Sequence, residues 1–161
     1  MDTEDHELQD LRLAMDLRRT AAAWLAAFET ALDAGDAAGL GALFHADSHW
    51  RDVLAFTWHM TPVAGRDAIV SRLLAEQDRT RAHGFALPQD RRPPRLVTRV
   101  GIQVIEALYE FSTAIGQGAG IVRLSLDEDG SMKAWLLSTT LQSLTGHEER
   151  IDARRPASCA R

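Results

Sequence analysis

The segment AGDAAGLGALFHADSHWRD, from Ala34 to Asp52, contains the change from helix to strand that decides the fold. Gly35 predicts the end of a helix, because glycine readily adopts the left-handed conformation that follows a last helical turn. Asp36 is a typical N-cap residue, so the run behind it predicts a short second helix. From about Ala46 to Trp58, aromatic and β-branched residues predict a strand and a loop.

Helical patterns lie on both sides of this segment. Apolar side chains recur at intervals of three and four before Gly35, which predicts a long first helix. These side chains are Leu8, Leu11, Met15, Trp24, Phe28 and Leu32. After Gly65, the segment RDAIVSRLLAEQDRTRAHG predicts a third helix that stops at Gly84.

The remainder of the chain has the alternating pattern of β-strands. Residues 94–108 alternate between apolar and charged side chains, and residues 120–126 alternate more cleanly. In the second segment Arg123 falls on the opposite face from Val122 and Leu124. Helices first and antiparallel strands afterwards predict an α+β fold, in which helices cover one face of a curved sheet.

The end of the chain predicts one more hairpin and then a tail. Asp129 and Gly130 are a hairpin turn signal, and residues 131–144 form the expected last strand. A chain of 161 residues fits one domain, which we expect within residues 1–150. Residues 151–161 lose the apolar periodicity and are expected to be a disordered tail.

The composition is that of an ordinary soluble protein. The formal net charge is -5, and no block of Lys and Arg suggests a nucleic-acid surface. The apolar runs are too short to span a membrane. The N-terminal residues are acidic and polar, unlike a secretory signal, so a cytoplasmic location is expected. The single cysteine, Cys159, excludes an intrachain disulfide.

The order of elements resembles the NTF2-like superfamily, the cone-shaped fold of ketosteroid isomerase and the SnoaL-like polyketide cyclases. Two segments carry the resemblance: AGDAAGLGALFHADSHWRD, and GRDAIVSRL from Gly65 to Leu73. It covers roughly residues 20–147. The resemblance implies a curved mixed or antiparallel sheet with three helices packed on its concave side. It also implies a homodimer formed through the outer face of the sheet.

A narrower resemblance concerns HWRDVLAFTW, from His49 to Trp58, and AWLLSTTLQSLTGHEE, residues 134–149. These are similar to the NTF2-like segment that precedes the Rossmann domain in a group of flavin-dependent monooxygenases. The resemblance implies a free-standing accessory domain without a flavin, so no cofactor is expected. The glycine cluster GQGAG, from Gly116 to Gly120, is expected to join two strands and not to bind phosphate.

Asp52 is the candidate catalytic residue. By resemblance it matches the catalytic base of ketosteroid isomerase, where a desolvated carboxylate moves a proton beside a carbonyl group. The donors that the isomerase needs would fall at Phe28 and near Val122, which cannot donate. Asp52 could instead form an ion pair with Arg51, Arg99 or Arg123, or cap the loop that follows it.

The residues around Asp52 define the expected ligand pocket. Its predicted lining is aromatic with one cation: Trp50, Phe56, Trp58, Arg123 and Trp135. His59 is a weaker candidate for a general acid or base at the pocket mouth. No HxH or HExxH spacing occurs, so no metal site is expected.

Three functions remain open from the sequence. The first is a domain that binds a small apolar or aromatic molecule, accessory to an oxidoreductase. The second is a cofactor-free isomerase, cyclase, dehydratase or epoxide hydrolase that uses Asp52 for proton transfer. The third is a dimerisation module, which predicts a cone filled by its own side chains. Neither a nucleic acid nor a membrane is an expected partner.

Overall fold

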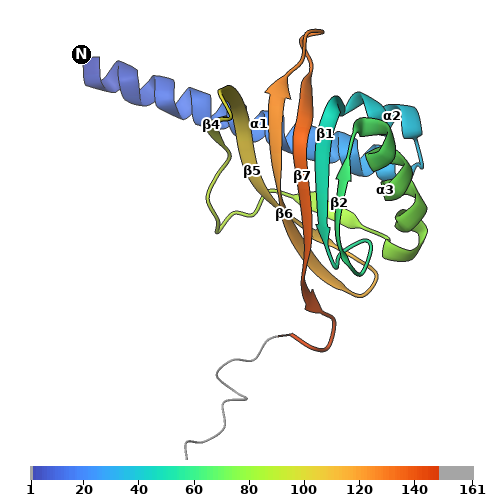
Figure 1. Ribbon diagram of the computed structural model, residues 1–161. Helices are drawn as coiled ribbons and strands as arrows, with labels where there is room; N and C mark the ends of the chain where they lie inside the picture. Colours follow the sequence, from blue (N-terminus) through green and yellow to red (C-terminus); the bar gives the residue numbers. More distant parts are fainter. Residues whose placement is uncertain (1, 149–161) are drawn as a thin grey trace, which may run out of the picture.

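The computed structural model describes residues 2–148, which form one curved sheet with helices on one of its faces (Figure 1). The helices are α1 (Asp2–Asp33), α2 (Ala37–Ala42) and α3 (Arg66–Thr80). The strands are β1 (Phe44–Val53), β2 (Met60–Ala64), β3 (His83–Ala86), β4 (Arg95–Arg99), β5 (Ile102–Ser112), β6 (Gly116–Leu126) and β7 (Met132–Leu144). The expected tail at residues 151–161 lies outside the described residues.

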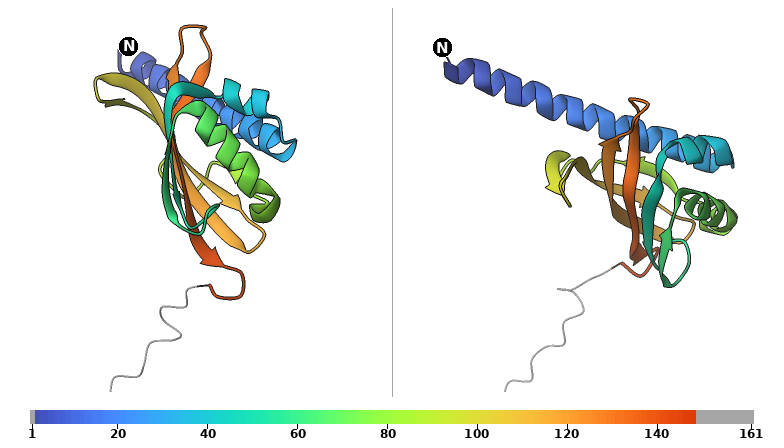
Figure 2. Two further views of the ribbon diagram at one scale, coloured as in Figure 1. Left: turned by 45° about the vertical axis from the view of Figure 1, so that its right-hand side comes forward. Right: turned by 45° about the horizontal axis from the view of Figure 1, so that its top comes forward.

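The strand order within the described chain is β2-β1-β7-β6-β5-β3, and β4 also pairs with β5. All these pairs are antiparallel except β1 with β7, which is parallel. The sheet curves around the three helices, which all lie on its concave side (Figure 2). The predicted α+β class, the mixed curved sheet and the three helices are therefore confirmed.

The boundaries of several elements differ from the sequence prediction. Residues 94–108 do not form one strand, because β4 and β5 are joined by a tight hairpin at Val100 and Gly101. Both residues have positive φ, 49° and 77°, which suits a two-residue turn between twisted strands. Two short strands were not predicted: β2, around Pro62, and β3.

The concave side of the sheet is filled by aromatic side chains. Eight of them lie in the core: Trp24, Phe28, Phe44, Trp50, Phe56, Phe85, Tyr109 and Phe111. Each is at most 7% exposed, and ring-to-ring contacts of 5.0–6.2 Å connect them in two groups, which the contact between Phe28 and Phe85 joins. The interior of the cone is therefore a packed core.

The glycine cluster lies within β6 and does not link two strands, contrary to the prediction. Gly118 pairs with Phe111 of β5, and Gly120 pairs with Tyr109. A Cβ atom at Gly118 would lie 2.6 Å from an atom of the Phe111 ring, and one at Gly120 would lie 2.6 Å from the Tyr109 ring. These glycines leave the space that the two aromatic rings occupy.

Helix α1 packs on the sheet with only its second half. Trp24, Phe28 and Leu32 are buried, whereas residues 5–16 are exposed. This first half projects beyond the edge of the sheet (Figures 1 and 2). Among the described residues, no helix combines the length and the apolar character needed to cross a membrane.

Replacing Gly120 with alanine should destabilise the fold by roughly 2–4 kcal/mol, because the new methyl group meets the Tyr109 ring and the Ser138 carbonyl. Urea denaturation measures the effect. Gly41→Ala in α2 is the matched control: its methyl group meets only the Arg66 side chain, at 4.0 Å, and should be neutral or stabilising. Equal stabilities of the two variants would contradict this account of the cluster.

Candidate functional site

Asp52 lies on the inner side of β1, in the middle of the core. Alternate residues of this strand, Ser48, Trp50 and Asp52, are buried, while His49 and Arg51 are exposed. Asp52 pairs with Thr61 of β2 on one side and with Thr139 of β7 on the other. Its side chain is 0% exposed, so the carboxylate depends on protein donors for its solvation.

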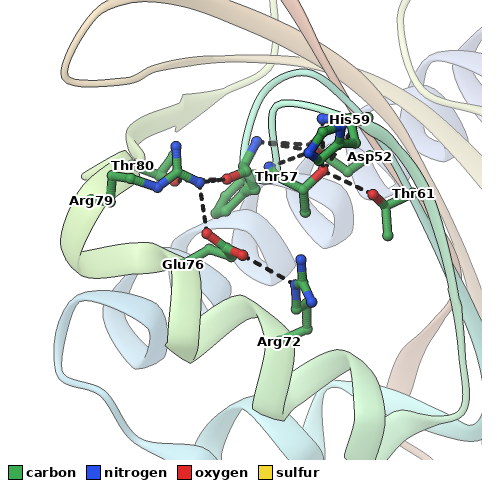
Figure 3. A network of polar contacts seen from close by, with 9 residues as sticks. Asp52, Thr57, His59, Thr61, Arg72, Glu76, Arg79 and Thr80 are labelled. Carbon is green, nitrogen blue, oxygen red and sulfur yellow. Dashed lines mark hydrogen bonds and ion pairs between the residues drawn. The ribbon is translucent and has the colours of Figure 1, made fainter.

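Both carboxylate oxygens accept hydrogen bonds from the loop between β1 and β2 (Figure 3), and Oδ1 also accepts one from Thr139 of β7. Oδ1 accepts from the Thr139 hydroxyl at 2.5 Å, and Oδ2 accepts from the Thr57 amide and hydroxyl, both at 2.8 Å. The Phe56 amide lies 3.1 Å from each oxygen. Four donor groups therefore surround the carboxylate.

The loop that Asp52 holds has an unusual backbone. Leu54 and Trp58 have positive φ, 65° and 60°, although neither is glycine. Such conformations cost free energy and persist when surrounding contacts hold them. The Leu54 amide donates to the His59 carbonyl at 3.0 Å, and Arg79 of α3 donates to the Phe56 carbonyl. The loop is fixed from inside by Asp52 and from outside by α3 (Figure 3).

The neighbouring polar groups are also paired. The Trp50 indole donates to the Thr139 hydroxyl at 3.0 Å, and the Tyr109 hydroxyl donates to the Ser138 carbonyl at 2.5 Å. Burial, together with the nearby charge of Asp52, raises the pKa of Tyr109 well above its ordinary value. Tyr109 is therefore neutral, and its hydroxyl proton is engaged in the hydrogen bond to the Ser138 carbonyl.

This arrangement makes Asp52 the cap of the loop that follows it. A general base needs contact with its substrate and an oxygen that can take up a proton. Asp52 has no exposed surface, and its oxygens accept from amides and hydroxyls. The sequence left two structural roles open for Asp52, an ion pair with an arginine and a cap of the following loop. Among the described residues, the structure shows the cap.

The other predicted site residues do not form one pocket. Trp50 and Phe56 pack edge to face within the core, with ring centroids 5.5 Å apart. Trp58 and His59 lie exposed in the loop, Trp58 with 45% of its surface accessible. Trp135 is half-buried at an irregularity in the pairing of β6 with β7. Among these residues, Trp50, Asp52 and Phe56 lie together in the core, and Trp50 and Arg123 both contribute to the lining of one surface hollow.

Arg123 faces the convex side of the sheet, which we call the open face. There it forms an ion pair with Glu106 of β5 at 2.9 Å, and Glu106 also pairs with Arg95 at 2.7 Å and Arg99 at 3.1 Å. Burial alone would raise the pKa of Glu106, but the hydrogen bonds from the three arginines lower it to about 2. Glu106 was not predicted, although it alternates with apolar residues along β5.

The open face also has a hollow of about 670 Å³ at its β1–β2 end. Its lining includes His49, Arg51, Pro62, Arg123, Leu136 and Ser138. Most of the lining surface is apolar, and Arg51, Arg123 and His49 are its nitrogen-bearing side chains. Within residues 2–148, no three His, Cys, Asp or Glu side chains gather closely enough to hold a metal ion.

Solved structures with similar folds identify the class of the fold. An NTF2-like superfamily protein from Salmonella enterica superposes with a TM-score of 0.56 at 11% identity, covering 86% of this chain and 96% of its own. An NTF2-like protein with a cystatin-like fold from Novosphingobium aromaticivorans gives 0.51 at 17% identity, covering 83% and 86%. ActVI-ORFA from Streptomyces coelicolor gives 0.52 at 15% identity, covering 74% and 92%.

These likenesses show that the chain has the NTF2-like cone fold. At such low identities they establish the fold alone. No protein-family model matches the chain, and no curated protein sequence matches it.

Asp52→Asn should destabilise the protein by about 2–4 kcal/mol, because an amide nitrogen cannot accept from the donors that now surround one carboxylate oxygen. Urea denaturation is the measurement. Asp47→Asn is the matched control, since Asp47 lies on the same strand with an exposed side chain and should change stability little. An Asp52→Asn variant as stable as the wild type would contradict the role of Asp52 as a loop cap.

Proposed function

We propose that this protein is a non-catalytic binding domain that holds a small molecule in the hollow on its open face. The observation that carries the proposal is the contrast between the two sides of the sheet. The concave side is packed with aromatic rings around a fully hydrogen-bonded Asp52, whereas the convex side carries the hollow of about 670 Å³. That volume lies within the range typical of small-molecule sites.

The lining of the hollow favours a ligand with an apolar or aromatic body and one negative charge. Pro62 and Leu136 supply apolar surface, and Arg51 and Arg123 supply cations. Arg123 is already paired with Glu106. Arg51 is exposed and has no ion pair among the described residues, so it is the cation that a ligand anion would meet.

An accessory role beside an oxidoreductase agrees with such a domain. The resemblance to the NTF2-like segment ahead of flavin-dependent monooxygenases supports this role. A domain that presents or stores a substrate needs neither a flavin nor a proton-transfer residue of its own. Proton transfer by Asp52, the alternative function, would require the carboxylate to be released from its four hydrogen-bond donors. Three of these belong to the loop of residues 54–59, and the fourth is the Thr139 hydroxyl.

Anilinonaphthalene sulfonate, an apolar fluorescent anion, is a suitable probe of the hollow. We expect saturable binding to the wild type, and Arg51→Glu should weaken it about tenfold, because a cation at the hollow is replaced by an anion. Fluorescence titration gives both affinities. Arg91→Glu is the control, since this exposed arginine lies in the segment before β4 and makes the same change of charge. Equal weakening by both variants would overturn the site.

We also propose that the open face forms a homodimer. Leu108, Ile121 and Leu136 are half-buried on neighbouring strands of this face, so an apolar surface crosses its centre. A twofold axis between β6 and β7, lying in the plane of the interface, would place β1 of each copy opposite β5 of the other. Ile121 of each copy would then lie near Ser138 of the partner subunit, so the apolar centre of the face packs against itself.

Ile121→Glu should break this dimer, because two carboxylates would be buried near the twofold axis. Sedimentation equilibrium should show a lower molar mass for this variant than for the wild type. Leu126→Glu is the control, since Leu126 is 67% exposed at the far end of β6. If Ile121→Glu keeps the mass of the wild type, the open face is not a dimer interface, and the titration with the fluorescent anion still tests the hollow.

A further inference from the structure

The first half of α1 carries large apolar side chains that nothing in the described chain covers. We call residues 5–19 the overhang. Within it, Leu8, Leu11, Leu13 and Met15 are 55%, 62%, 48% and 64% exposed. Monomeric proteins rarely expose several large apolar residues close together, and such patches mark interaction surfaces. The overhang projects from the domain as a continuous helix (Figures 1 and 2).

Leu8, Leu11 and Met15 form one stripe along the helix. Their spacing of three and then four residues is that of a coiled-coil seam. At 100° per residue, the stripe lies about 150° around the helix from Trp24 and Phe28. The stripe therefore faces away from the side of α1 that packs on the sheet, and a partner could approach it without meeting the core.

The charges of the overhang are distributed unevenly along its length. Three acidic side chains, Asp5, Glu7 and Asp10, lie toward its beginning. Arg18 and Arg19 lie at its end, where Asp16 is 3.8 Å from Arg19, and Arg12 lies near the middle. All seven of these side chains are exposed. A parallel copy would place acid beside acid, but an antiparallel copy places each acidic end beside a basic end.

We propose that the overhang pairs antiparallel with the overhang of a second copy of this chain. Pairing centred near residue 12 sets Leu8 against Met15 of the partner subunit. On the two flanks of the seam it brings Asp5 near Arg19 of the partner subunit and Glu7 near Arg18 of the partner subunit. The chain is thus complementary to itself, as an isologous contact requires.

The geometry of the domain permits this pairing. The overhang is about 22 Å long at 1.5 Å per residue. Pairing centred near residue 12 ends close to Leu17, where α1 begins to pack against the core of the domain. The two folded domains would therefore lie at opposite ends of the helix pair. This contact uses neither the open face nor the hollow, so it does not depend on the proposed function.

Sedimentation equilibrium of the full chain tests the pairing. The double variant Leu11→Glu, Met15→Glu should have half the molar mass of the wild type, with an unchanged circular dichroism spectrum because both residues are exposed in the single chain. Leu126→Glu should keep the wild-type mass. Adding the double substitution to the Ile121→Glu variant should also halve the molar mass. This comparison separates the helix contact from a contact through the open face. Equal masses with and without the double substitution would overturn the proposal.

Charge reversal tests the antiparallel direction. The variant Arg18→Glu, Arg19→Glu and the variant Asp5→Arg, Glu7→Arg should each associate about tenfold more weakly than the wild type, because like charges then face each other. A mixture of the two variants should regain the association, since each pair again has opposite signs. A mixture that stays as weak as its components would overturn the antiparallel arrangement.

Discussion

The buried carboxylate of Asp52 is the interaction on which the arrangement of β1, β2 and their loop depends. Removing a charge from water costs several kcal/mol, and the cost is offset only when the charge is fully hydrogen-bonded. The amides of Phe56 and Thr57 can reach Asp52 only if the loop takes its unusual path, with Leu54 and Trp58 in left-handed conformations. The stability of the buried charge and the shape of the loop therefore require each other.

The filled core and the fixed loop together determine where this domain can bind. A cone that encloses a ligand needs small side chains or an open mouth, but here aromatic rings occupy the interior. Gly118 and Gly120 fit this packing, because their missing side chains admit the rings of Phe111 and Tyr109. Because glycines at these positions admit the protein's own aromatic rings, the interior is filled, and the proposed ligand site lies on the outer surface.

Local signals in the sequence predicted the fold class and most elements. Asp36 was expected to cap α2, and its carboxylate accepts from the Gly39 amide at 2.9 Å. The hairpin at Val100 was not predicted, because a β-branched residue rarely adopts positive φ and alternation continues across the turn. The role of the glycine cluster was missed for another reason. The aromatic rings that need these glycines belong to β5, and the sequence of one strand does not determine which residues of its neighbour it pairs with.

The candidate site also depends on contacts between separate strands, which the sequence does not reveal. Asp52 was singled out from the sequence, and the structure buries its carboxylate, but its partners, Thr57 and Thr139, could not be inferred. The spacing of five residues to Thr57 depends on the loop conformation, and the contact with Thr139 depends on the parallel pairing of β1 with β7. The same residue in the same fold can be a base or a cap. The choice is set by whether neighbouring donors satisfy the carboxylate before a substrate can reach it.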